Sequence, residues 1–402
     1  MSSSAARPRR FGPPRLGAGL ALLCLAAAWG CGPTPTSVKI VAVFVDLSGP
    51  GRELGREIQD GARLALRDAR RESRQGVELL VQDDQGKVDR AARLAGYLND
   101  LPELVAVIGP GSPATAAAAL DVFGRGEGVP TLVPIPVSVD LVRRGDRVFG
   151  LAPSAEYLGE TLAWFAATEL SANSAATLAA REGFGLALER AFASELGRLG
   201  GRPAARVAVD QAGGLSDSLA RALLSAPAVL VAARPEGTGP LVAALRAKGY
   251  GRPILTEGPP GPAGDAPPPD SAAAAAGDSL NAAVYYPVLL DLVADSSARA
   301  FGARFHDAYG RPPTEAAALA YDGVNLVLES LENGATDRAT VLRWLQSTGG
   351  PTTSFQGVSG RFFFSRERSA VRDLSVVSEV TGGTVATRSA SAGKVPTGQG
   401  NR

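Results

Sequence analysis

The chain has 402 residues, and its 41 basic and 40 acidic side chains leave a formal net charge of +1. Nothing in this balance suggests a nucleic-acid-binding domain, which usually carries a basic stripe, so we expect no nucleic-acid partner. One histidine and two cysteines nearly exclude a metal site of nitrogen and sulfur ligands, and the sequence has no phosphate-binding loop motif that would indicate a cofactor.

The first 30 residues have the pattern of a secretory signal peptide. Arginines at positions 7, 9, 10 and 15 precede the apolar run Leu16–Gly30, whose length of about 15 residues is too short to span a bilayer comfortably. We therefore exclude residues 1–30 from the fold and expect an exported protein.

The signal ends in Ala28-Trp29-Gly30-Cys31, and a small residue before a cysteine at this point resembles the lipobox of bacterial lipoproteins. The resemblance implies that Cys31 is acylated after cleavage and that residues 31–37 link the lipid anchor to the fold. The protein would then be periplasmic or at the cell surface, tethered to a membrane. Trp29 departs from the lipobox pattern, so an ordinary signal peptide with an incidental cysteine stays open.

Strand and helix patterns alternate after residue 37. Continuous apolar, β-branched runs predict buried strands, and apolar residues at helical spacing predict the helices between them. The predicted strands are 38–45, 77–82, 104–108 and 131–135, with helices over 58–69, over 91–98 and from residue 113. This alternation predicts a parallel sheet with helices on both faces.

A second series of the same kind begins near Glu156 and predicts a second α/β sheet. Its predicted strands are 175–180, 206–209, 228–232 and 253–256, with a helix between each pair. Residues 258–277 are rich in Pro, Gly and Ala and predict a surface loop.

The last part of the chain returns to helices and then to strands. Apolar faces around positions 301, 321 and 341 predict three helices, and residues 362–380 alternate as strands do. Residues 381–402 have little apolar surface and are expected to fray.

Two loops of the first series carry groups that suit a ligand, because ligands of open parallel sheets bind at the carboxyl ends of strands. Gly111 and Ser112 follow the predicted strand 104–108 and open a helix, where a glycine admits a ligand to the backbone and N–H groups favour a carboxylate. Val137 and Ser138 follow the next strand and add a second hydroxyl on the same edge. A glycine turn with a serine N-cap is the alternative interpretation of the first loop.

The second series offers an aromatic and an acidic side chain at equivalent places. Phe184 follows the predicted strand 175–180, and Glu257 follows the strand 253–256. With the two serines they make a set that suits a zwitterion such as an amino acid, since hydroxyl and N–H groups would hold its carboxylate and Glu257 its ammonium. Asp83 and Asp84 also end a strand, and we expect them to cap the next helix.

Several segments, in this order, resemble the branched-chain amino acid (Leu/Ile/Val) binding proteins of ABC transporters. They read VAVFVDLSGPGRELGREIQDGARLAL, VELLVQDDQG, VAVIGPGSPATAAAA, GVPTLVPIPVS and GRPPTEAAALAYDGVNLVLESL, within residues 38–380. The resemblance implies a type I periplasmic-binding fold, in which two Rossmann-like lobes with parallel sheets are joined by a three-strand hinge and close on the ligand. It also implies a membrane-embedded ABC permease as partner.

The resemblance divides the chain into lobes and assigns roles to its residues. Lobe 1 would comprise 38–154 and 284–350 and lobe 2 would comprise 155–283 and 351–385, with 386–402 as a disordered tail. Ser112 matches the serine that holds the ligand carboxylate, and Ser138 the residue that touches carboxylate and ammonium, next to a backbone carbonyl at Pro136 or Val137.

On the same basis Phe184 covers the ligand, Glu257 pairs with its ammonium, and the loop Leu47–Leu54 forms another wall of the pocket. Two positions depart from the pattern. Arg234 and Leu54 stand where the branched-chain binders have aromatic residues. Arg234 would either donate two hydrogen bonds to an acidic side chain of the ligand or lie solvated beside the pocket, so the identity of the ligand stays open.

Enzyme function is not expected, because the sequence has no nucleophile elbow, Walker loop or dinucleotide-binding glycine motif. The alternative is a lipoprotein of the same fold that acts as an envelope regulator or sensor through a protein partner, since fold alone does not decide function.

Overall fold

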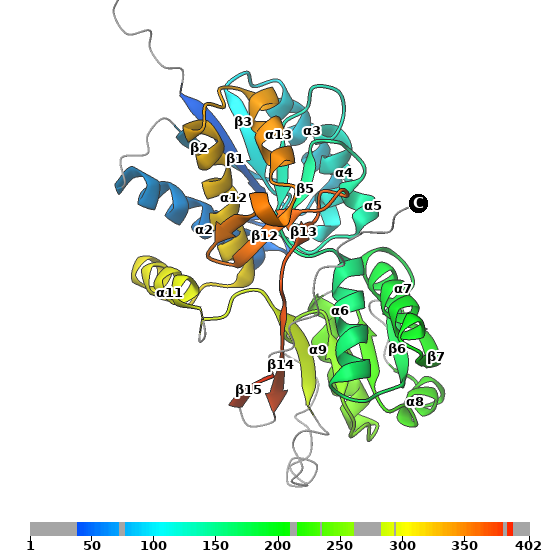
Figure 1. Ribbon diagram of the computed structural model, residues 1–402. Coiled ribbons are helices and arrows are strands. Elements are labelled where there is room, and N and C mark those ends of the chain that lie inside the picture. Colours follow the sequence, from blue (N-terminus) through cyan, green and yellow to red (C-terminus); the bar gives the residue numbers. More distant parts are fainter. Residues whose placement is uncertain are drawn as a thin grey trace, which may run out of the picture. The chain divides into compact units, whose positions relative to one another are not determined.

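The computed structural model describes residues 38–71, 77–209, 215–233, 235–260, 283–292, 295–380 and 384–388. They form two lobes, each built on its own sheet (Figure 1). The sheet of lobe 1 has the order β2-β1-β3-β4-β5, and every pairing in it is parallel. Its strands are β1 (Lys39–Val45), β2 (Val77–Asp83), β3 (Leu104–Ile108), β4 (Thr131–Val133) and β5 (Val148–Gly150).

Helices cover both faces of this first sheet, which explains its continuous apolar strands. Side chains of β1 alternate between two cores: Val41 and Val43 pack on one face, whereas Ala42 and Phe44 pack on the other. The helices supplied by the same part of the chain are α2 (Arg52–Arg71), α3 (Val88–Asn99), α4 (Pro113–Phe123) and α5 (Val139–Val142).

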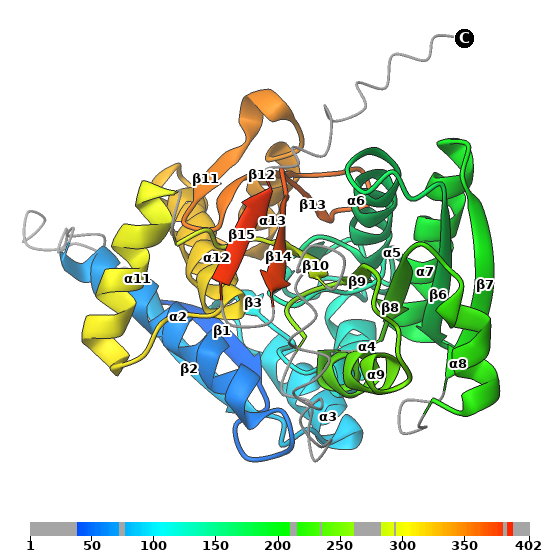
Figure 2. The same cartoon turned by 90° about the horizontal axis from the view of Figure 1, so that it is seen from below.

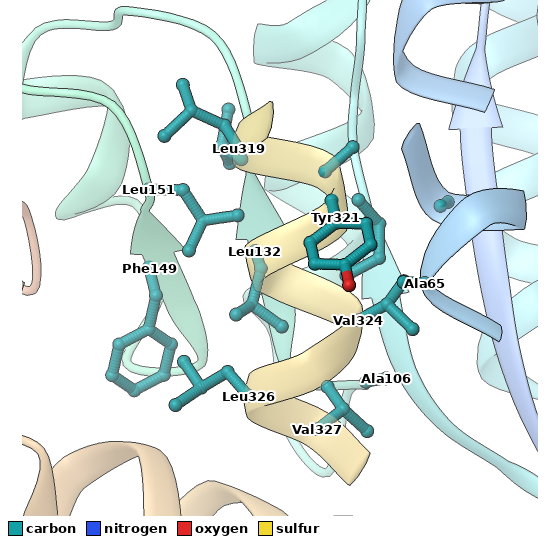
Figure 3. Packing of buried hydrophobic residues seen from close by; sticks show 14 of the residues in the cluster. Ala65, Ala106, Leu132, Phe149, Leu151, Leu319, Tyr321, Val324, Leu326 and Val327 are labelled. Atoms are coloured by element: carbon teal, nitrogen blue, oxygen red, sulfur yellow. The ribbon is translucent and has the colours of Figure 1, made fainter. Parts of the chain in front are cut away.

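Three further helices of lobe 1 come from much later in the chain: α11 (Ser296–Tyr309), α12 (Glu315–Glu332) and α13 (Arg338–Ser347). Helices α11 and α12 contact α2, and Figure 2 shows them beside it. Figure 3 shows Leu326 of α12 extending toward Phe149, whereas Val327 lies on the other side of the helix, beside Ala106. The backbones of α2 and α12 also approach closely, since a Cβ at Gly61 would lie 2.0 Å from the Ala317 carbonyl oxygen.

The sheet of lobe 2 has the order β15-β14-β10-β9-β8-β6-β7. Its first five strands in the chain are parallel, and β14 and β15 add antiparallel pairs. The strands are β6 (Ser174–Ala180), β7 (Arg202–Val209), β8 (Val229–Ala232), β9 (Ile254–Thr256), β10 (Val284–Val288), β14 (Ser375–Val380) and β15 (Thr384–Arg388). The helices of this lobe are α6 (Ala155–Thr168), α7 (Gly183–Arg198), α8 (Asp217–Leu224) and α9 (Pro235–Ala247).

A small third sheet of β11 (Phe355–Gly357), β12 (Gly360–Phe364) and β13 (Ala370–Val371) follows the 3-10 helix η1 (Pro351–Thr353). Its apolar side chains belong to the core of lobe 1, where the ring of Phe364 lies 4.9 Å from that of Phe149.

The division into lobes therefore differs from the expected one at two places. Residues 351–371 were expected in lobe 2, but the aromatic residues of β11 and β12 draw this segment into the core of lobe 1. Strand β10 was expected in lobe 1, but it pairs with β9 and β14 in the sheet of lobe 2.

The expectation that the chain frays from residue 381 is wrong for Thr384–Arg388, which pairs with β14 along its whole length. The predicted loop lies largely outside the described residues, because 261–282 are not described. Within the described part of the chain, no helix combines the length and the apolar character needed to cross a membrane.

The chain passes between the lobes three times, after β5, after β10 and after β13, and a buried charged cluster ties these crossings together. Arg372 on the third crossing donates to the carbonyl oxygen of Leu151 on the first at 2.7 Å and to that of Ser359 at 2.8 Å. Glu315 accepts from the backbone N–H of Leu289 on the second crossing at 2.7 Å. Asp322 accepts from the backbone N–H of Ser359 at 3.0 Å.

Burial dominates the electrostatics of this cluster. It lowers the pKa of Arg372 to about 10, although the carboxylates of Asp322 and Glu315 act in the opposite direction. Burial likewise raises the pKa of Asp322 and of Glu315, against the hydrogen bonds that each carboxylate accepts. The guanidinium also lies 4.6 Å from the centre of the Phe362 ring, a cation–π distance.

Candidate functional site

The carboxyl end of β3 carries the first candidate group. Ser112 is the N-cap of α4, is buried, and makes no side-chain capping hydrogen bond, so its hydroxyl is not used to close the helix. Gly111 packs tightly, because a Cβ there would lie 2.7 Å from side-chain carbons of Val45 and Ile58. Pro113 opens α4 without an N–H, and the N–H groups of Thr115 and Ala116 donate to the carbonyl oxygen of Ser112 at 3.2 and 3.0 Å. The Ser112 hydroxyl and the N–H of Ala114 are therefore the donors that this turn could offer to an anion.

The carboxyl end of β4 carries the second group, and because β4 pairs with β3, both lie on one edge of the sheet. Ser138 is half-buried, precedes α5 and makes no side-chain capping bond. The carbonyl oxygen of Val137 accepts from the N–H of Ala155 at 3.1 Å. Glu156 at the start of α6 accepts from the N–H of Val139 at 3.0 Å, a contact that sequence reasoning missed. These two bonds tie the Ser138 loop to the start of lobe 2.

Lobe 2 presents its candidate groups at the carboxyl ends of β6 and β9. Phe184 lies in the first turn of α7 and is partly buried against the core of that lobe. Glu257 follows β9 directly, is 8% exposed, and accepts from the hydroxyl of Thr238 at 2.8 Å. Since β8 lies between β6 and β9, both groups are on one edge of the second sheet, two strands apart.

The structure thus brings the predicted residues together as two sets. Gly111, Ser112, Val137 and Ser138 share the edge of the first sheet, and Phe184 and Glu257 share the edge of the second. Arg234 and Cys31 lie outside the described residues, so their expected roles stay predictions.

The loop that follows β1 is fixed by two aspartates. Asp46 accepts from the N–H groups of Gly49 at 2.6 Å and Gly51 at 2.7 Å. Asp83 accepts from the N–H of Leu47 at 2.8 Å and from the hydroxyl of Ser48 at 2.6 Å. The loop expected to wall the pocket is therefore held rigidly at the carboxyl edge of the sheet.

We expected Asp83 and Asp84 to cap the next helix, and this expectation is wrong, because the N-cap of α3 is Lys87. Asp84 instead accepts from Gly86 and from the hydroxyl of Thr115 in α4. Burial raises the pKa of Asp84, against these two hydrogen bonds. For Asp83, burial acts in the same direction, but bonds from Ser48, Leu47 and Gln85 outweigh it and lower the pKa.

Oxygen atoms of Asp46, Asp83 and Asp84 lie within 4.8 Å of one another, a spacing that a metal ion could bridge. Each carboxylate nevertheless accepts hydrogen bonds from the surrounding loops, and these bonds account for the cluster by themselves. We therefore interpret the cluster as the structural support of the loops around Ser112.

A family model described as a periplasmic binding protein matches residues 38–384. No curated protein matches the chain.

Solved structures match the chain over most of its length. The leucine-binding protein LivK from Thermotoga maritima has a TM-score of 0.70 at 21% identity, covering 88% of this chain and 98% of that one. LivJ from Streptococcus pneumoniae, solved with isoleucine, has a TM-score of 0.67 at 20% identity, covering 87% and 100%. A solute-binding protein from Rhodopseudomonas palustris BisB5, solved with 3,4-dihydroxybenzoic acid, has a TM-score of 0.70 at 18% identity, covering 89% and 98%. These likenesses confirm the predicted two-lobed fold.

Proposed function

The chain belongs to the periplasmic binding protein family, and on that premise we propose that it is the extracytoplasmic solute-binding protein of an ABC importer. Its solute would be an amino acid or a similar small polar molecule that carries a carboxylate. The solute would bind between the carboxyl edges of the two sheets and favour closure of the lobes.

The observation that carries this proposal is that the buried N-cap Ser112 makes no side-chain capping hydrogen bond. A serine at the N-cap of a helix usually bonds to the first turn, as Ser154 does at α6, where its hydroxyl accepts from Tyr157 at 3.2 Å. Ser112 makes no such bond, although it is buried. A solute carboxylate would accept from this hydroxyl and from the N–H of Ala114 in the first turn of α4, where the helix dipole adds favourable charge.

The ligands named for the structural relatives narrow the class. Isoleucine in one and 3,4-dihydroxybenzoic acid in another share a carboxylate and differ in whether an ammonium is present. Glu257 supports an amino acid, because a buried carboxylate at the site would pair with an ammonium and repel a second acid. We therefore place amino acids ahead of aromatic acids as the solute.

Isothermal calorimetry of the chain against the common amino acids and against benzoate tests the function. A solute that binds the folded chain stabilises it by RT ln(1 + [L]/Kd), about 2.7 kcal/mol when the ligand is at 100 times its Kd. A thermal-shift assay should therefore give the same ranking as the calorimetry. The absence of heat and of stabilisation with both groups of acids would contradict solute capture and favour a regulator that acts through a protein partner.

Two variants separate the roles of the proposed groups. Ser112→Ala should weaken binding of any carboxylate solute on the order of tenfold or more, since a hydrogen bond to a charged group contributes about 1.5–3 kcal/mol. Glu257→Gln should weaken amino acids by a similar factor and leave benzoate unaffected or improved. Ser347→Ala, on the exposed end of α13, is the matched control and should leave both affinities unchanged.

The proposed location is the periplasmic or outer side of a membrane, with the lipid anchor at Cys31 and the ABC permease as partner. Cys31→Ser should move the chain from the membrane fraction to the soluble fraction after export, while solute affinity stays the same. If the unsubstituted chain were already found in the soluble fraction, the lipid anchor would be contradicted, but the proposed solute binding would not.

A further inference from the structure

A basic groove lies on lobe 1, away from the groups discussed so far. Its volume is about 530 Å³, and its lining includes Arg63, Arg67, Arg70 and Arg71 of α2 above Leu79 and Val81 of β2. The four arginines follow one another at intervals of four, three and one residues, which places them on neighbouring positions of one helix face. Among the described strands β2 is the edge strand of its sheet, and no other described strand covers this side of it.

The described residues neutralise the positive charge in the groove only in part, and Asp60 lies near enough to Arg63 for the arginine to act against the rise in the pKa of Asp60. No acidic residue is among those that line it. Arg71 comes no closer than 4.0 Å to Asp68, and the other oxygen of Asp68 is held by Arg304 at 3.0 Å. The guanidinium of Arg67 stacks 5.6 Å from the centre of the Tyr309 ring, and its buried Nε has no hydrogen-bond partner in the described part of the chain. A groove with these walls suits an anion.

The groove lies at the end of the first sheet that is opposite to Ser112. Lys39 at the start of β1 pairs with Val77 at the start of β2, so both strands begin at the same edge. Helix α2 runs back to that edge, because its last residue, Arg71, is followed after a short connection by Val77. The described fold therefore begins at the same edge of the sheet at which α2 ends. Residues 31–37 reach at most about 25 Å even when fully extended.

We propose that this groove docks anionic phospholipid headgroups and so orients lobe 1 on the membrane that carries the anchor. The proposal rests on the proposed tether at Cys31, which would hold the basic edge within reach of the headgroups. Phosphate oxygens would accept from the arginines, and the apolar floor of Leu79 and Val81 would contact the carbon atoms next to the phosphate. The edge with Ser112 would then face away from the bilayer, toward incoming solute.

Vesicle co-sedimentation of residues 31–402 tests the docking, since the arginines and the apolar run of residues 1–30 would themselves bind anionic vesicles. The chain carries Cys31→Ser, so that no acyl chain contributes, and is mixed with phosphatidylcholine vesicles with or without phosphatidylglycerol. Binding should require phosphatidylglycerol and should fall steeply as salt is added. Reversal of the three exposed groove arginines, Arg63, Arg70 and Arg71, to glutamate should lower the partition coefficient by on the order of 100-fold.

The matched control reverses Arg93, Arg190 and Arg366, which are exposed and do not line the groove. It changes the net charge by the same amount, and its partition coefficient should stay within about threefold of that of the Cys31→Ser parent. Equal losses in the two triple variants, equal binding to pure phosphatidylcholine, or no binding of the parent would each overturn the proposal.

Calorimetry with the solute keeps this outcome separate from the proposed function. The groove variant should bind solute as the parent does, since its substitutions lie at the opposite edge of the sheet. If the chain did not bind vesicles but still bound solute, the membrane-docking role of the groove would be contradicted and the proposed solute-binding function would not.

Discussion

The polar side chains at the carboxyl edge of the first sheet fall into two groups, according to whether they accept hydrogen bonds from the backbone of the protein. Asp46 and Asp83 accept from the backbone of the loop after β1, whereas Ser112 and Ser138 leave their capping positions unused. The first pair fixes the loops, and the second pair belongs to the proposed solute site. A substitution in each pair should accordingly act on a different quantity, on stability in the first and on affinity in the second.

Asp83 gives a prediction with a defined pH dependence. Its pKa is lowered in the folded chain, so its contribution is fully present above the unfolded value near 3.8 and is lost as the pH falls through the folded value. Asp83→Asn should therefore lower the free energy of unfolding at neutral pH by about 1 kcal/mol, allowing for partial exposure. Urea unfolding at several pH values should show this difference shrink in acid. Asp140→Asn, an exposed change on α5, is the control, and a loss that is constant with pH would contradict the assignment.

The sequence could predict that Ser112 and Glu257 lie at the carboxyl ends of strands, because a polar residue shortly after a buried apolar run is a local signal. It could not predict the cluster of Arg372, Asp322 and Glu315. Arg372 binds the carbonyl oxygen of Leu151, 221 residues earlier, and its immediate sequence gives no indication that it is buried. Such pairs depend on the path of the chain, which short-range patterns do not contain.

Among the elements, long apolar strands and amphipathic helices were predictable, and short ones were not. Strand β3 has the predicted bounds, since five buried apolar residues in a row leave little choice. Strand β4 ends at Val133 rather than at residue 135, and Pro134 has no N–H to continue the ladder. Strands β5 and β11 have three residues each, too few to show a period.

The contact between α2 and α12 gives a prediction about helix packing. Gly61→Ala would add a Cβ 2.0 Å from the Ala317 carbonyl oxygen, so the helices must move apart, at a cost of about 2 kcal/mol. Gly96→Ala in α3 is the matched change, because a Cβ there meets nothing within 4 Å. It should stabilise the chain by about 0.5–1 kcal/mol through helix propensity. Chemical denaturation of both variants checks the opposite signs, and the same sign in both would contradict the packing.

In the molecule as a whole, the charged cluster of Arg372, Asp322 and Glu315 connects the segments in which the chain crosses between the lobes. Arg372→Met would leave Asp322 and Glu315 buried without their cation and would free the carbonyl oxygens of Leu151 and Ser359. We expect a loss of about 3 kcal/mol or more in the free energy of unfolding. Arg361→Met on the exposed face of β12 should change it by less than about 0.5 kcal/mol. Guanidinium unfolding of the pair tests this, and equal small effects would show that the cluster is not needed.

Lobe 1 is also discontinuous in sequence, which predicts the behaviour of a fragment. A chain that ends after β10, at Val288, lacks α12 and the sheet of β11 to β13, which complete the core around Val43 and Ile58. We expect this fragment to lack a cooperative unfolding transition for lobe 1, as followed by urea titration and limited proteolysis. A chain that extends to residue 388 is the control. A cooperative transition of lobe 1 in the shorter fragment would contradict the dependence on α12.

The same discontinuity sets the order of events for a protein that leaves the cytoplasm as proposed. Secretion channels pass extended chains, and an amino-terminal domain that folds early would block its own passage. Here β1 to β5 are synthesised first but cannot bury their apolar face until α12, ending at Glu332, has followed them. The topology itself thus delays folding of the leading segment until most of the chain is across.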